Sequence, residues 1–129
     1  MQLLPTGAKA RKDTPLCTGV LDYFPLALAE VARVSKAGND QHNPGEPLHW
    51  AREKSPDHAD SILRHLMERG KIGADGMRHS AQMAWRALAL LQLEMEAAQA
   101  EIVISPKYIS TLNIPLGGSS PENDDDIPF

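Results

Sequence analysis

The clearest pattern along the chain is an apolar position at every third or fourth residue between about residues 77 and 100. Such spacing places one face of a long helix against its neighbours, and here it persists over three heptads. Leu90 and Leu93 widen the apolar arc, so the helix should be central or should share its second face with another subunit. The heptad seam consists of Met77, Ala81, Ala84, Leu88, Leu91, Met95 and Ala98.

A shorter helix is expected in the first third of the chain. The pattern turns helical after Asp22, Pro25 suits a first helical turn, and Gly38 is a natural stop. Residues 39–54 carry Asn, Pro and Gly turn chemistry, which predicts a loop.

A second short helix has the strongest start signal in the sequence. Ser55 offers an N-cap, Pro56 a first helical residue and Asp57 an acid that faces the helix dipole. Gly70 should end this helix, and a turn over residues 73–76 should lead into the long helix.

These elements predict an all-α fold, namely a small bundle of three to four helices. We expect an irregular N-terminal arm over residues 1–21 and a helical domain over residues 22–116. The domain should end in an extended segment after Glu101, and residues 117–129 should form a flexible acidic tail.

Composition narrows the function. At 129 residues the chain has room for one modest domain, and its single cysteine, Cys17, fits a reducing cytoplasm. Four of the 17 acidic residues and none of the 13 basic residues lie in the tail, so the remaining body is neutral. A neutral body argues against direct nucleic-acid binding, and no apolar run is long enough to span a membrane.

Polar side chains interrupt the long helix near its start. His79, Gln82 and Arg86 are spaced by three and four residues and therefore share one face. Because short connections make successive helices antiparallel neighbours, Arg64 and His65 should lie near His79. Arginine forks onto phosphate and histidine can transfer a proton, so this patch suits an anionic ligand.

Each of these polar residues also has a purely structural explanation. His79 can pair at a helix start, the helix dipole explains Asp57, and Asp60 with Arg64 can form an ordinary i,i+4 pair. The sequence has no cysteine pair for zinc and no Gly-rich phosphate loop. Carboxylates that could hold Mg²⁺ between protein and phosphates are Glu30, Glu53 and Asp57.

Four motifs carry a family resemblance: EVA in the first helix, HW before the second, RHL within it and DGMRHSAQMAW at the start of the third. Over about residues 20–96 the chain resembles the N-terminal domain of bacteriophage dATP/dGTP diphosphohydrolases. The resemblance implies nucleotide metabolism in phage DNA synthesis, with cleavage between the α- and β-phosphates that depends on Mg²⁺ or Mn²⁺. The positions that match the family pattern are Glu30, His49, Trp50, Arg64, His65, Asp75 and His79.

Roles follow from the resemblance together with the polar pattern. His65 and His79 would be catalytic if the protein is an enzyme. Gln82 stands where family members often have a second histidine, and the third helix lacks a Glu-x-x-Asp pair. Both departures concern catalysis more than nucleotide binding. The residues expected to bind substrate are Arg64, Arg86, His49, Trp50 and Gln82.

The end of the sequence, DDDIPF, is similar to the acidic tip of bacterial single-stranded-DNA-binding proteins. Phe129 could bury its ring in a small pocket while its carboxylate meets a basic residue at the rim, and Pro128 lowers the entropy lost on docking. A merely solubilising tail explains the charges but not the apolar end. The expected docking residues are Asp124, Asp125, Asp126, Ile127, Pro128 and Phe129.

Two functions remain open at this point. One is a nucleotide-binding, hydrolase-like protein that the tail tethers to host replication and repair proteins such as nucleases, helicases and replication factors. The other is a non-catalytic interaction protein that uses the tip to recruit or inhibit such a nuclease or helicase. Either would work in the cytoplasm of the bacterial host, as a homo-oligomer formed through residues 77–100.

Overall fold

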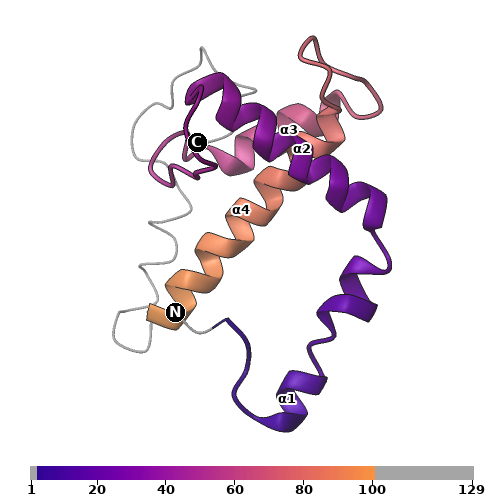
Figure 1. The fold of residues 1–129 in the computed structure, drawn as a ribbon, viewed down its shortest axis with the longest axis vertical. Coiled ribbons are helices and arrows are strands. Elements are labelled where there is room, and N and C mark those ends of the chain that lie inside the picture. Colours follow the sequence, from indigo (N-terminus) through magenta and orange to yellow (C-terminus); the bar gives the residue numbers. More distant parts are fainter. Residues whose placement is uncertain (1–2, 101–129) are drawn as a thin grey trace.

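The computed structural model of the chain describes residues 3–100, and within them every regular element is helical (Figure 1). This confirms the all-α prediction of a bundle of three to four helices. The predicted extended segment and the acidic tail lie outside the described residues. The elements are α1 (Ala8–Lys12), the π-helical η1 (Cys17–Leu21), α2 (Pro25–His42), α3 (His58–Met67) and α4 (His79–Ala100).

Helix α2 does not end at Gly38, as the sequence predicted, but continues to His42. The reason is Asn39, whose side chain is fully buried. Its Nδ2 donates to the carbonyl of Glu46 at 3.1 Å, and its Oδ1 accepts from the backbone N–H of His49 at 3.2 Å. These two bonds attach the following loop to the helix, and they offset the cost of about 1 kcal/mol for a glycine in a helix interior.

Helix α3 begins at His58, two residues later than Pro56, the predicted first helical residue. Asp57 holds the N-cap position, yet its side chain makes no cap hydrogen bond. Its carboxylate instead accepts from Arg64 Nη2 at 2.8 Å, so Arg64 pairs with Asp57 in place of the predicted Asp60. The start of α3 is therefore set by an ion pair and not by dipole or capping preferences.

Helix α4 is central, because it packs against α2 on one side and α3 on another. The apolar core lies between α2 and α4 and contains Val34, Ala81, Trp85 and Ala89. Trp50, from the loop, packs edge-to-face against Trp85 with ring centroids 5.7 Å apart. This core fixes the face of α4 that α3 can cover.

The connection from α3 to α4 is a tight link. It contains an isolated antiparallel bridge between Ile72 and Arg78, and the backbone N–H of Gly73 donates to Met77 at 2.8 Å. The turn needs the positive φ of 81° at Gly76, a conformation that glycine adopts without strain. The link ends directly at His79 and so fixes the position of that side chain.

Residues 3–24, which we call the arm, differ from the predicted irregular segment because they include α1 and η1. The arm leads away from the first turn of α2, and in this view its N-terminal end comes back toward the lower end of α4 (Figure 1). No single helix within residues 3–100 has both the length and the apolar character needed to cross a membrane. The segments Ala8–Leu21 and Pro25–His42 meet that test only together, as a pair bent by 85°.

The Asn39 attachment predicts a stability effect. Asn39→Ala should lower the free energy of unfolding by about 1–3 kcal/mol, because the Glu46 carbonyl and the His49 N–H lose their buried partner. Urea unfolding at one protein concentration measures this. Asp40→Ala is the matched control, since the Lys36–Asp40 pair is exposed and its loss should cost about 0.5 kcal/mol or less. Equal losses in the two variants would contradict this role of Asn39.

Candidate functional site

Helices α3 and α4 meet through polar side chains that form three layers. Residues 58, 61 and 65 of α3 and residues 79, 82 and 86 of α4 are spaced by three and four, and the helices run in opposite directions. All six side chains except that of His79 are buried. We call this set the polar ladder; His58 contacts Arg86 and His65 contacts His79, while Ser61 and Gln82 occupy the positions between these pairs on α3 and α4.

The end of the ladder at the start of α3, which we call the inner end, contains Arg86, whose side chain is 0% exposed. Its Nη1 donates to the carbonyl of Ser55 at 2.8 Å and lies 3.1 Å from His58 Nδ1 and 3.8 Å from Asp57 Oδ1. Ser55 adopts a left-handed conformation with φ of 49°, which is uncommon for a residue other than glycine. The backbone before α3 is thus locally strained at Ser55, the residue whose carbonyl binds the buried guanidinium of Arg86.

Asp57 supplies the opposite charge. Burial on its own raises the pKa of the Asp57 carboxyl, but the hydrogen bond from Arg64 and the charge of Arg86 outweigh burial, and the pKa falls below its usual 3.8. Asp57 therefore stays ionised at neutral pH. It holds Arg64 and Arg86 together as a small network with one carboxylate between two guanidinium groups.

His58 is held neutral in this network. Arginine can only donate, so Nδ1 of His58 accepts from Arg86 and the ring hydrogen lies on Nε2. Burial lowers the pKa of His58, the charge of Arg86 lowers it further, and Asp57 offsets only part of this, so the pKa falls from 6.5 to about 4. His58 is thus an acceptor for a buried cation and not a proton carrier at neutral pH.

The outer end of the ladder holds a histidine pair. His65 Nδ1 and His79 Nδ1 lie 3.0 Å apart, so one of them must donate a hydrogen to the other. His65 is buried, while His79 is partly exposed. The pair can therefore move a proton between a buried nitrogen and a ring that reaches solvent. This confirms that the end of α3 meets the start of α4.

Asp75, in the turn between α3 and α4, forms hydrogen bonds at this outer end. Its Oδ1 accepts from the backbone N–H of Met77 at 2.9 Å, and its Oδ2 accepts from Gln82 Nε2 at 3.1 Å. The amide of Gln82 is thereby oriented toward the turn. Within residues 3–100, Gln82 Oε1 and Ser61 Oγ in the middle layer have no hydrogen-bond partner. His58 Nε2, in the inner layer, also has no partner within these residues, so buried hydrogen-bonding capacity remains in both layers.

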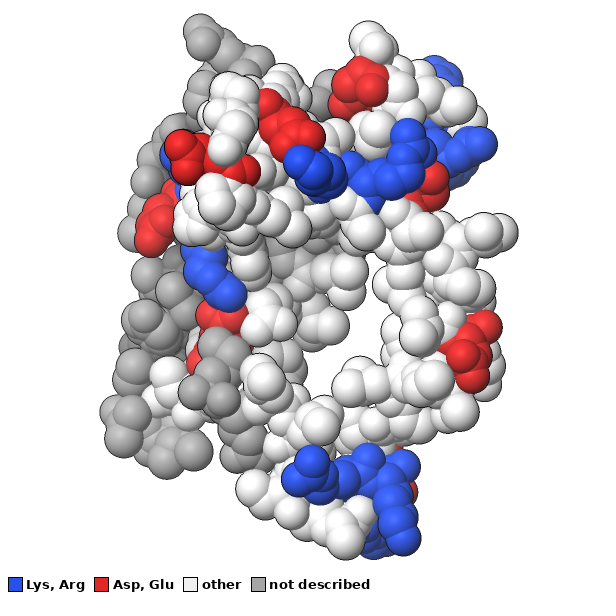
Figure 2. All heavy atoms as spheres, in the orientation of Figure 1, with Lys and Arg blue, Asp and Glu red and all other residues white. Residues whose placement is uncertain are grey.

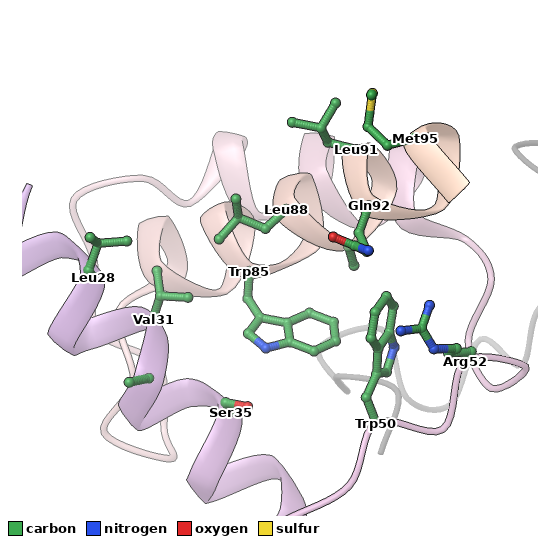
Figure 3. Close-up of a pocket in the computed structure, with 12 residues that line it drawn as sticks. Leu28, Val31, Ser35, Trp50, Arg52, Trp85, Leu88, Leu91, Gln92 and Met95 are labelled. Carbon is green, nitrogen blue, oxygen red and sulfur yellow. The ribbon is translucent and has the colours of Figure 1, made fainter. Parts of the chain in front are cut away.

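Two predicted substrate-binding residues lie away from the ladder. His49 is exposed, and its backbone is tied to Asn39. Trp50 lines a separate open cavity of about 630 Å³ between α2 and α4 (Figure 3). Arg52 stacks on Trp50 at 4.1 Å and binds both carboxylate oxygens of Glu96, at 2.7 and 2.6 Å. The predicted site therefore divides between two faces of α4.

The three carboxylates predicted to bind a metal are not brought together. Glu30 pairs with Arg33, Asp57 is engaged by two arginines, and Glu53 is exposed in the loop. Among residues 3–100, no group of three or more His, Cys, Asp or Glu side chains is placed to hold a metal ion. The side chains described here thus do not fit a metal site built by the protein.

The sequence predicted four of the six ladder residues. It identified His79, Gln82 and Arg86 as one face, and it placed Arg64 and His65 nearby. It missed Ser61 and the role of His58 as the acceptor for Arg86. The missing signal was available, because residues 58, 61 and 65 repeat the same steps of three and four on α3.

Comparison with protein families matches residues 5–102 to the family described as "dATP/dGTP diphosphohydrolase, N-terminal". The match covers the arm from residue 5 onward, all of the helices and the whole polar ladder. Comparisons with curated proteins and with solved structures gave no match.

The pKa of His58 sets a pH dependence of stability. In the unfolded chain His58 binds a proton near pH 6.5, whereas in the folded chain it does so only near pH 4. The contribution of neutral His58 to the free energy of unfolding is therefore complete above about pH 6.5. It is lost as the pH falls toward 4, by at most about 1.4 kcal/mol per pH unit. Urea unfolding at a series of pH values between about 7 and 4 measures the slope of the free energy of unfolding against pH.

His58→Asn is the informative variant, because its Oδ1 can still accept from Arg86 but does not titrate. It should flatten the slope between about pH 6.5 and 4. His49→Asn, at an exposed position, should keep the wild-type slope. A wild-type slope in His58→Asn would assign the pH dependence to another group.

Proposed function

Because the chain belongs to the dATP/dGTP diphosphohydrolase N-terminal family, we propose that it binds a purine deoxynucleoside triphosphate at the outer end of the polar ladder. The observation that carries this proposal is the His65–His79 pair at 3.0 Å, beside Arg64 and open to solvent at His79. A buried polar interface of this kind costs stability when hydrophobic packing could replace it. Its presence in a small helical domain therefore favours a ligand-binding role.

Arg64 would contact the phosphates. It lies on α3 one residue before His65, its side chain is 34% exposed, and Asp57 Oδ2 anchors its Nη2 at 2.8 Å. An anchored guanidinium loses little side-chain entropy when it binds, and its fork matches the oxygens of a phosphate. His79 would donate a hydrogen bond to the same phosphates, with His65 fixing its ring orientation. Arg86 and Gln82 would act indirectly: Arg86 would hold Asp57 in place, and Gln82 would hold Asp75.

Hydrolysis to a deoxynucleoside monophosphate and pyrophosphate is the activity that the family description suggests. In that reaction His79 and His65 could hold and relay the proton of the attacking water or of the leaving group. Mg²⁺ or Mn²⁺ would have to arrive with the triphosphate, since the described carboxylates form no metal site. Binding is therefore the function that this geometry supports most directly.

Calorimetric titration with dATP, dGTP and dCTP tests the binding proposal. The wild type should bind the purine nucleotides, and Arg64→Gln should weaken binding about tenfold to hundredfold, as expected for the loss of a charged hydrogen bond. Arg69→Gln is the matched control, because Arg69 is an exposed arginine that donates to the carbonyl of Leu66. No binding of any purine nucleotide, with or without Mg²⁺, would refute the proposal. Pyrophosphate release by the wild type would identify an enzyme, and binding without release a non-catalytic nucleotide binder.

We further propose that the acidic tip, Asp124 to Phe129, docks onto proteins that recognise the similar tip of single-stranded-DNA-binding proteins. The support is the sequence DDDIPF, in which apolar residues follow an acidic run. If the helical domain proves catalytically silent, this docking alone would make the chain an interaction protein that recruits or inhibits a nuclease or helicase.

Deleting Phe129 tests the docking. Pull-downs from a bacterial lysate should lose their partners on the deletion, because the ring that enters the pocket is gone. The partners should also be displaced from the wild type by a DDDIPF peptide, and binding should weaken as salt rises. Retention of every partner by the truncated protein would contradict the docking.

A further inference from the structure

The described part of the chain buries little apolar volume. Its buried hydrophobic residues are Val34, Ala81, Trp85, Ala89 and Ala97, three of which are alanines. A small domain needs most of its large apolar side chains in the core to offset the entropy of folding. Many of those side chains are instead exposed, and they concentrate on two surfaces.

The first surface is the second half of the heptad seam. Ala81 of that seam is buried against α2, but Leu88, Leu91 and Met95 are each about half exposed, at 51%, 53% and 53%. They are spaced by three and four residues, so they form one strip, which we call the α4 stripe. All three also line the open cavity that contains Trp50 and Trp85 (Figure 3).

The second surface is the arm. Tyr23 and Phe24 form an edge-to-face pair with centroids 6.0 Å apart, yet both remain exposed. Leu26, in the first turn of α2, is 83% exposed. An opening separates the arm from the helical body, and the atoms around it in this view are almost all uncharged (Figure 2). Toward its α2 end the arm also exposes the apolar residues Leu16, Val20 and Leu21.

We propose that a second copy of this chain covers both surfaces, with the arm of each copy packed on the α4 stripe of the other. A two-fold axis that places one arm on the partner's stripe also places the partner's arm on the first stripe. One operation therefore covers both apolar surfaces, which pairing of the two α4 helices alone would not do. The open cavity beside the stripe gives the aromatic pair of the arm a concave, tryptophan-lined surface to enter.

The size of the surface fits a stable dimer. Nine large apolar side chains, six at the arm and α2 start and three on α4, are exposed. At roughly 100 Å² each they present about 900 Å² per copy, close to the roughly 800 Å² that one partner contributes to a standard interface.

The mass in solution is the first test, by light scattering after size exclusion. The wild type should have the mass of two chains, and Leu91→Glu should have the mass of one, because the dimer would bury an unpaired carboxylate. Leu63→Glu is the matched control: Leu63 is equally exposed, but it lies on α3, and this variant should stay dimeric. A monomeric wild type at high micromolar concentration would overturn the proposal, and so would a dimer that survives Leu91→Glu with its helical circular dichroism intact.

Thiol cross-linking then tests the arm contact without relying on a disruptive variant. Cys17 lies exposed in the arm, and Ala87 is exposed on α4 beside the stripe. Wild type is mixed with Cys17→Ser/Ala87→Cys, so that neither copy carries both thiols, and a short bismaleimide is added. Mass spectrometry should find a peptide that joins position 17 of one copy to position 87 of the other. The control partner, Cys17→Ser/Ala59→Cys, places the thiol on the exposed face of α3 and should give little of the corresponding product. Absence of the 17–87 product, or equal yields from the two partners, would overturn the exchanged-arm arrangement.

This inference does not depend on nucleotide binding, since the stripe and the polar ladder use different residues of α4. Leu91→Glu can abolish the dimer while dATP or dGTP titration still reports on the ladder. The two proposals can therefore fail separately.

Discussion

The structure depends on one costly constraint, the complete burial of the Arg86 guanidinium. A cation removed from water must recover several kcal/mol from its surroundings, and nothing apolar can supply this. Here the Ser55 carbonyl, the neutral ring of His58 and the carboxylate of Asp57 do so together. The left-handed conformation of Ser55 places its carbonyl on that side chain, and the charge of Arg86 adds to burial in lowering the pKa of His58.

The same constraint positions the outer end of the ladder. With His58 fixed against Arg86, the pitch of α3 brings His65 level with His79, which the tight link of residues 71–79 presents at the first turn of α4. Asp57 then ties Arg64 to the inner network by a single hydrogen bond. An anion that binds Arg64 would therefore meet a group that is already oriented, and preorganisation of this kind reduces the entropy cost of binding.

Much of this arrangement follows from sequence rules, and the exceptions have physical causes. Periodicity predicted the long helix and the shared face of Gln82 and Arg86, and the short connection predicted that the end of α3 at His65 meets the start of α4 at His79. Capping rules misplaced the start of α3 because Asp57 forms ion pairs instead of capping. Glycine statistics ended α2 too early because Asn39, one residue later, holds the loop. Trp50 was predicted to bind substrate from the family resemblance, whereas it packs on Trp85 of α4, away from the ladder. Specific side-chain contacts beyond a single helical turn decided each of these cases, and local propensity carries no information about them.

The adjacent residues Trp85 and Arg86 show how α4 organises the molecule. Consecutive side chains on a helix point about 100° apart, so Trp85 faces α2 and the apolar core while Arg86 faces α3 and the polar ladder. Because one face of α4 makes polar contacts, less of its surface is available for a hydrophobic core. The small residues Ala81 and Ala89 reduce the volume of that core further. The polar interface of α3 and α4 can contribute specificity and a place for a ligand, but it adds little net stability. The stability that α3 does not supply must come from the remaining apolar face of α4, where Leu88, Leu91 and Met95 lie half exposed. A polar ladder on one side of α4 and an apolar stripe on the other are thus two consequences of the same distribution of residues.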